Sequence, residues 1–237
     1  MKNLVIVESP NKIKSIEKYL GKDYEVKASV GHIVYLPNSG EHRFGVDMTT
    51  WTPNYKIDPD KQAVVTELKA LAKKADKVYV ATDPDREGEA IADNLVQFLN
   101  IEDKYSRIRF NEITESAIKA AIDNPTEVDH KLVESQVARR ILDRIIGYKL
   151  SSLMKAKISN APGNPSAGRV QSIALKLIVE REREIEAFIP VKYETLSAII
   201  DEKNQIVAEY FNQANTDDKS WIKPEEAQSI REKLTGS

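Results

Sequence analysis

A chain of 237 residues allows one large or two ordinary domains, and 41% hydrophobic residues are enough for a buried core. No stretch approaches the roughly 20 apolar residues of a membrane span, the first residues lack a secretory signal pattern, and the absence of cysteine excludes disulfides and thiolate metal sites. With no cysteine in the chain, a cytoplasmic, reducing location is the simplest expectation. The net charge of -2 conceals an uneven distribution of charge along the chain.

The chain begins with a buried strand that leads directly into a helix. Residues 4 to 7 are all apolar, as in a parallel strand covered on both faces, and Ser9-Pro10 is typical of a helix start. Glu8 therefore ends the strand and Lys12 lies in the first helical turn, at the edge where open α/β sheets bind ligands. An acid at the end of a buried strand packs poorly, whereas Lys12 alone is explained as well by a surface lysine.

The pattern up to residue 125 alternates between strands and helices. Strands are predicted at 3–8, 24–30, 77–82 and 107–111, and helices at 10–20, 60–75, 87–99 and 114–123. This order predicts an α/β domain with a mostly parallel sheet flanked by helices.

Three carboxylates follow the third predicted strand. Asp83, Asp85 and Glu87 occupy alternate positions in the run ATDPDREGEA. Alternate residues of an extended segment point the same way, so we expect these acids to converge, which is unfavourable unless a cation lies between them. Mg²⁺ is the natural ion because it prefers oxygen ligands. The alternative is a solvated acidic loop in which Asp83 and Pro84 form only a turn.

From about residue 129 to 186 the pattern is helical and basic. Between residues 131 and 183 there are 11 lysines and arginines against 4 acids, although the whole chain is slightly acidic. Apolar residues repeat every four positions from Val133 to Ile145 and predict a core-facing stripe. A basic segment in an acidic chain indicates contact with a polyanion; the alternative is a basic amphipathic helix on a solvated face.

Another face of this helix gathers Arg140, Asp143 and Arg144. Arg139 and Asp143 also have the spacing of a simple i,i+4 ion pair. The turn-rich loop at 159–172, SNAPGNPSAGRVQS, leads into a further helix from Ala167, whose small residues allow close backbone approach. In that helix start, Arg169 is placed to hold a phosphate. Gln171 is suited to a base or sugar contact, although an ordinary helix start explains it nearly as well.

Beyond Pro190 the pattern changes to short strands. Residues 193–200 and 205–211 alternate around a polar turn and predict a hairpin, and Pro224 begins a short helix that ends at Leu234.

Six motifs, in this order and spacing, resemble the type IA DNA topoisomerases. They are VESPNK at 7–12, SVGHI at 29–33, ATDPDREGEAI at 81–91, FNEIT at 110–114, QVARRILDRIIGY at 136–148 and PSAGRVQS at 165–172. The resemblance covers residues 2 to about 195, and VESP at the first strand resembles topoisomerase I or reverse gyrase rather than topoisomerase III. It implies a toprim domain at 1–125, an α-helical DNA-binding domain at 126–188 and the start of a β-rich arch domain at 189–237.

The resemblance also implies roles for individual residues. Glu8 would act as general acid and base and Lys12 would stabilise the phosphate, with Asp83, Asp85 and Glu87 as ligands of Mg²⁺. The implied DNA-binding residues are Arg139, Arg140, Asp143, Arg144, Ser166, Arg169 and Gln171. The implied partner is DNA, chiefly single-stranded segments of negatively supercoiled DNA, for a monomeric, nucleoid-associated protein that needs neither a membrane nor ATP; the sequence has no phosphate-binding P-loop motif.

Type IA enzymes cut DNA with a tyrosine, forming a 5′-phosphotyrosyl intermediate. None of the 9 tyrosines lies in a segment like the GLITYMR of that family, so we expect an N-terminal part of such an enzyme that lacks the nucleophile and the rest of the arch. Two other functions are weighed against this one. Another toprim enzyme, such as a primase or nuclease, would polymerise or degrade nucleic acid, and a non-catalytic module would only bind single-stranded DNA.

Overall fold

The computed structural model describes residues 2–160, 163–201, 203–213 and 218–235. The chain divides into two compact units, Met1–Ile173 and Ala174–Ser237. Parts of the predicted loop at 159–172 (residues 161 and 162) and of the predicted hairpin turn (residue 202) lie outside the described residues. The division into domains at 125 and 188 stays a prediction. Within the described ranges, no helix is long and apolar enough to cross a membrane.

The first unit is built on a four-stranded, fully parallel sheet. Its strand order is β2-β1-β7-β8. The strands are β1 (Asn3–Val7), β2 (Tyr24–Ala28), β7 (Val78–Ala81) and β8 (Tyr105–Arg107). The parallel sheet flanked by helices confirms the predicted fold class.

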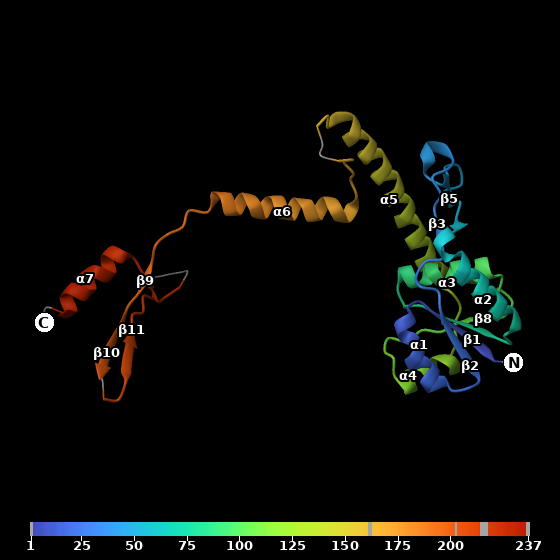
Figure 1. Ribbon diagram of the computed structural model, residues 1–237, viewed down its shortest axis with the longest axis horizontal. Coiled ribbons are helices and arrows are strands. Elements are labelled where there is room, and N and C mark those ends of the chain that lie inside the picture. The colour runs from blue at the N-terminus through green and yellow to red at the C-terminus, as the bar shows by residue number, and fades with distance from the viewer. Residues whose placement is uncertain (1, 161–162, 202, 214–217, 236–237) are drawn as a thin grey trace. The chain divides into compact units, whose positions relative to one another are not determined.

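Helices cover both faces of this sheet (Figure 1). One face carries α1 (Ile13–Leu20) and α4 (Glu115–Asp123), and the other carries α2 (Gln62–Lys74) and α3 (Arg86–Leu99). The central strands divide their side chains by alternation: Leu4 and Ile6 pack towards α2 and α3, whereas Val5 and Val7 pack towards α1. A strand with two buried faces requires an unbroken apolar run, which is why β1 and β7 could be recognised.

Residues between β2 and α2 form a small β-rich insertion that periodicity did not predict. Two antiparallel pairs join β3 (Val34–Tyr35) to β6 (Lys56–Ile57) and β4 (Val46–Asp47) to β5 (Thr52–Pro53). Short 3₁₀ helices accompany them: η2 (Glu41–Arg43) lies within the insertion, η3 (Pro59–Lys61) precedes α2, and η1 (Pro10–Lys12) precedes α1. Strands of two residues are too short to show a period of two.

All four predicted strands differ from the observed ones at one or both ends, and two of them differ by more than one residue. The strand expected at 107–111 lies at Tyr105–Arg107, where its residues pair with Val78–Val80 of β7. The strand expected to reach residue 30 ends at Ala28, because Val30 and Gly31 adopt left-handed conformations with φ of 58° and 80°.

The helical segment that follows contains two helices, α5 (His130–Lys157) and α6 (Arg169–Ala187). Asp129 caps the start of α5 by accepting hydrogen bonds from the backbone N–H groups of Lys131 and Leu132. The predicted apolar stripe of α5 packs against α3 and the insertion through Val133, Val137 and Ile141. This contact brings the basic helix onto the α/β layer, within one compact unit.

The second unit contains the predicted hairpin and terminal helix. β10 (Ser197–Asp201) pairs with β11 (Ile206–Glu209), and α7 (Pro224–Thr235) follows. An additional pair joins β9 (Glu194–Thr195) to β12 (Trp221–Ile222), next to a stack of Tyr193 on Trp221 with ring centroids 4.1 Å apart.

Candidate active site and nucleic-acid interface

The acidic loop between β7 and α3 is fixed by hydrogen bonds at both ends. The Oγ1 of Thr82 donates to the carbonyl of Gly88 at 2.6 Å, and Oδ1 of Asp85 accepts from the Gly88 N–H at 2.7 Å, which makes Asp85 the N-cap of α3. A Cβ atom at Gly88 would lie 2.0 Å from the carbonyl oxygen of Asp83, so only glycine fits there. The loop therefore holds Asp83 and Asp85 at the carboxyl edge of the sheet.

Glu8 and Lys12 reach the same edge from the neighbouring strand. Ser9 caps η1 and sets Lys12 towards the acidic loop, where its ammonium forms an ion pair with Asp83. Burial of the Glu8 carboxyl, and then repulsion by Asp83, raise its pKa above the ordinary value, with a further contribution from Asp85. The prediction that the carboxyl ends of β1 and β7 lie side by side is thus confirmed.

The expected convergence of all three loop acids was wrong in its geometry. Helix α3 begins at Arg86, so Glu87 lies in a helical turn rather than in an extended segment, and the period of two no longer applies. Its carboxylate lies 3.4 Å from Nε2 of His32 instead. Over the described residues, no group of three or more His, Asp or Glu side chains is arranged to hold a metal ion.

A pocket of about 410 Å³ opens beside Lys12, Asp83 and Asp85. Its lining also includes Phe110, Asn111, Glu112 and Ile113, which belong to the FNEIT motif. The pocket therefore joins three of the motifs that were recognised separately in the sequence, and it has the polar lining expected where a charged substrate binds.

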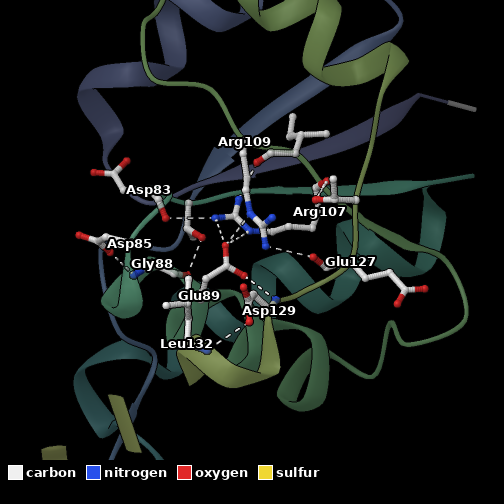
Figure 2. A network of polar contacts seen from close by, with 12 residues as sticks. Asp83, Asp85, Gly88, Glu89, Arg107, Arg109, Glu127, Asp129 and Leu132 are labelled. Atoms are coloured by element: carbon white, nitrogen blue, oxygen red, sulfur yellow. Dashed lines mark hydrogen bonds and ion pairs between the residues drawn. The ribbon is translucent and has the colours of Figure 1, made fainter. Parts of the chain in front are cut away.

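Beneath this edge lies a buried ionic network that the sequence analysis missed (Figure 2). Glu89 and Arg107 are both fully buried, and their ion pair has an N–O distance of 2.8 Å. Arg109 donates from Nε to the same carboxylate at 2.9 Å. Burial alone would raise the pKa of Glu89, but hydrogen bonds from Arg109, the Asp129 backbone and Arg107 lower it below the ordinary value. Adjacent charges in ATDPDREGEA carry no period that distinguishes a buried acid from exposed ones.

Two arginines of α5 bind the insertion. Nη2 of Arg144 donates to the carbonyl of Leu36 at 2.9 Å and Nη1 to Oδ1 of Asn38 at 2.9 Å, while Nη2 of Arg140 lies 3.4 Å from the carbonyl of Val34. Burial, and then the charge of Arg140, lower the pKa of His32. Arg140 and Arg144 were expected as phosphate ligands, but some of their N–H donors are used to join α5 to the insertion.

The other predicted DNA-binding residues form a second cluster between α5 and the start of α6. Asp143 accepts from Arg169, with N–O distances of 2.9 and 2.8 Å, and lies 3.8 Å from Nε of Arg139. Gln171 and Ser166 are in contact at 3.4 Å. The predicted pair of Arg139 with Asp143 is present, but Arg169 is the nearer partner of that acid.

A second pocket, of about 780 Å³, lies between the insertion and α5. Its lining includes His42, Arg43, Lys149 and Lys155, with Phe44 and Tyr148, and no acid among the described residues. Sequence reasoning missed His42 and Arg43 because the insertion had no recognisable period, although a basic pair next to an aromatic residue was visible in HRF. Cationic and aromatic side chains together suit a single-stranded nucleic acid.

Two family models match successive parts of the chain. The toprim domain model matches residues 3–113 and a model described as DNA topoisomerase matches residues 127–237. The chain belongs to the type IA DNA topoisomerase family. Both catalytic candidates, Glu8 and Lys12, and the acidic loop lie in the toprim match, and α5 and α6 lie in the topoisomerase match.

Proteins named DNA topoisomerase 1 in three bacteria are similar to this chain. Identity is 47% over 225 residues in Salmonella typhimurium, 48% over 220 in Escherichia coli and 44% over 238 in Haemophilus influenzae. These alignments cover 83%, 81% and 86% of this chain, but 26%, 25% and 27% of the relatives. The chain therefore spans about a quarter of the length of the curated relatives it matches.

A solved structure gives the same family at the level of the fold. The full-length topoisomerase I of Thermotoga maritima superposes with a TM-score of 0.71 at 42% identity, covering 96% of this chain and 37% of that one.

Proposed function

We propose that this chain supplies the acidic cluster and the DNA-binding helices of an ATP-independent type IA topoisomerase. That enzyme relaxes negatively supercoiled DNA by transient single-strand cleavage through a 5′-phosphotyrosine, strand passage and religation. The observation that carries the proposal is the meeting of Glu8, Lys12 and Asp83 at the carboxyl edge of the toprim sheet, in one unit with the basic helix α5.

Mg²⁺ fits the donor set at this edge. Carboxylate oxygens are the ligands that this ion prefers, and the repulsion felt by Glu8 from Asp83 and Asp85 reflects negative charge that Lys12 does not fully offset. Asp83 and Asp85 are the residues that would hold the ion, whereas the carboxylate of Glu87 lies beside His32 and apart from them. When bound, Mg²⁺ neutralises charge on the scissile phosphate and positions it.

Glu8 and Lys12 supply the proton and the cation of the proposed cleavage. A raised pKa keeps Glu8 protonated over a wider range of pH, as a general acid for the leaving 3′ oxygen requires, and the same group acts as base on religation. Lys12, already directed into the pocket by η1, stabilises charge on the phosphate.

The proposed nucleophile is a tyrosine outside these 237 residues. The pocket beside Asp83 has no tyrosine in its described lining. The tyrosines that pack against the hydrophobic clusters of the first unit are Tyr19, Tyr24, Tyr55, Tyr79, Tyr105 and Tyr148. A side chain held in such a cluster is poorly placed to attack a phosphodiester.

The proposed DNA path follows α5 and the basic pocket. Phosphates would meet the cationic lining of the pocket, with Arg43 and Lys149 as its most direct candidates, and the partly exposed ring of Tyr148 offers a stacking face. The cluster of Arg139, Asp143 and Arg169 joins α5 to the start of α6. Ser166 and Gln171, near the same start of α6, complete the proposed interface.

Single-stranded DNA binding tests this proposal. Replacing Arg140, Arg144 or Arg169 by Gln should weaken binding about equally for different sequences and reduce the salt slope by roughly one phosphate for each arginine. Fluorescence anisotropy with a labelled oligonucleotide over a range of salt concentrations measures both. Lys119→Gln, which removes the same charge from an exposed ion pair on α4, is the matched control, and its binding should stay unchanged. Affinity that does not vary with salt, or a triple variant that binds normally, would contradict the proposal.

A further inference from the structure

A continuous chain of hydrogen bonds runs below the candidate active site from the acidic loop to the start of α5 (Figure 2). Nη2 of Arg107 donates to the backbone carbonyl of Asp83 at 3.1 Å, and Nε of the same side chain donates to Oε1 of Glu89 at 3.0 Å. The other oxygen of Glu89, Oε2, accepts from the backbone N–H of Asp129 at 3.0 Å. Three bonds thus connect Asp83 with the residue that caps α5.

Glu89 is the point where these contacts meet. Its carboxylate is completely buried and is shared by two arginines and a backbone N–H. Arg107, also fully buried, additionally donates to the carbonyls of Val80 and Ile108, at the carboxyl ends of β7 and β8. Because the bonds of Arg107 and the bond of Glu89 to Asp129 are made with main chain or with another buried charge, a shift of one partner leaves a buried polar group unsatisfied, which is unfavourable in an apolar environment. The network therefore favours one relative placement of loop and helix.

We propose that Glu89 is a positioning residue that couples the acidic loop to the DNA-binding helix α5. Glu89 is not directed at substrate, and in this role it acts through Arg107 on Asp83 and through Asp129 on the first turn of α5. DNA bound along α5 and a cation bound at the loop then favour the same arrangement, so each raises the affinity of the other. The inference rests on the proposed function, because it needs both binding events.

The test measures that coupling directly. The dissociation constant of a labelled single-stranded oligonucleotide is determined with and without saturating Mg²⁺, at constant ionic strength, and the ratio is the coupling factor. In the unaltered chain the factor should be about fivefold or more, the usual lower bound for coupled sites. Glu89→Gln, which keeps the shape of the side chain but removes its charge, should bring the factor close to one. Glu115→Gln on α4 removes the same charge from an exposed ion pair and should leave the factor unchanged.

A second measurement examines the protein without either ligand. In Glu89→Gln, amide hydrogen exchange should accelerate together at Gly88 and in the first turn of α5, at Leu132, while Asn124 at the end of α4 keeps its protection. If Glu89→Gln does not fold, Arg109→Gln serves in its place, since Arg109 is one-third exposed and its loss leaves the Glu89–Arg107 pair intact. This variant should lower the coupling factor by a smaller amount.

The outcomes separate the two proposals. A folded Glu89→Gln that retains the coupling factor of the unaltered chain would overturn the positioning role, because a purely structural residue changes stability and not coupling. A factor of one in the unaltered chain, with normal salt-dependent DNA binding, would overturn the inference and leave the proposed function standing. Absence of DNA binding altogether would overturn the proposed function and the inference with it.

Discussion

Glu8 holds a charge where the fold gives it little support. The carboxyl is partly buried at the end of β1 and faces Asp83 and Asp85, with Lys12 as the opposing cation. The raised pKa means that the folded state favours the protonated form, so this residue stabilises the fold most at low pH, below its ordinary pKa of 4.5. That contribution is lost as pH rises through the higher folded pKa. A residue that destabilises the resting protein at neutral pH is typical of a functional site.

Glu8→Gln should therefore make the chain more stable at neutral pH. Gln keeps the shape of the side chain and removes the repulsion, so Tm at pH 7 should rise, whereas near pH 4 the variant and the unaltered chain should differ little. Differential scanning calorimetry at both pH values measures this. Glu102→Gln, at an exposed position before β8, is the control and should leave Tm nearly unchanged. A lower Tm for Glu8→Gln at pH 7 would contradict the electrostatic account.

Glu89 should give the opposite dependence on pH. Its folded pKa lies below the ordinary 4.5, because the two arginines and the Asp129 N–H stabilise the anion. Its contribution to stability is complete above the ordinary pKa and is lost as pH falls through the lowered one. Glu89→Gln should thus lower Tm at pH 7 and flatten the decline of Tm below about pH 5, so that the two curves approach each other in acid. Parallel curves would contradict this assignment.

Among the elements, α3 shows most clearly where sequence reasoning succeeds and where it fails. Its strand-loop-helix context was predicted from the apolar residues before Asp83 and the amphipathic run after it, which are local signals. The strand and the helix were placed to within one residue, but the alternation of an extended segment was applied as far as Glu87, which lies inside the helix. Helix starts depend on which side chain caps them, and here Asp85 performs that task.

Substitutions can separate the two roles of Asp85, which are the N-cap of α3 and the proposed ligand of Mg²⁺. Asp85→Asn retains an oxygen that accepts from the Gly88 N–H, so stability should change little, whereas Asp85→Ala loses the cap and should cost about 1 kcal/mol. Both variants lose a charged ligand and should weaken Mg²⁺ binding, measured by calorimetry in the presence of DNA. Urea unfolding gives the stabilities. Normal Mg²⁺ affinity in Asp85→Asn would remove Asp85 from the proposed ligand set.

The contacts of the insertion with α5 and the buried ionic network could not be predicted from the sequence. Contacts of Arg140 and Arg144 with carbonyls in residues 34–38 join segments far apart in the chain, and nothing in the local pattern of either segment indicates the other. Exposed and buried arginines also look alike in sequence. Glu8, Lys12 and Asp83 could be brought together because parallel strands end at a common edge, whereas Arg107 and Glu89 depend on tertiary packing.

For the molecule as a whole, the proposed catalytic acid and metal ligands lie in this chain and the proposed nucleophile does not, which predicts the activity of the chain. The purified 237-residue chain should bind DNA but neither relax negatively supercoiled plasmid nor form a covalent protein–DNA adduct, with or without Mg²⁺. General acid catalysis supplies about 10² to 10⁴-fold, which is too little for phosphodiester cleavage without a positioned nucleophile. Gel assays of plasmid topology and of denatured, end-labelled DNA detect the two activities. An adduct on a tyrosine of this chain would contradict the proposal that its nucleophile lies elsewhere.

The parallel sheet also governs how the chain acquires its fold. β1 is central, yet it pairs on one side with β7, where Leu4 lies opposite Val78. The closure of so long a loop precedes any gain from the contact, so folding is expected to be slow compared with that of a helical bundle. During synthesis, Leu4 and Ile6 have no sheet neighbour on that side until β7 leaves the ribosome, and the most apolar strand of the nascent chain stays open to pairing with other chains for that interval.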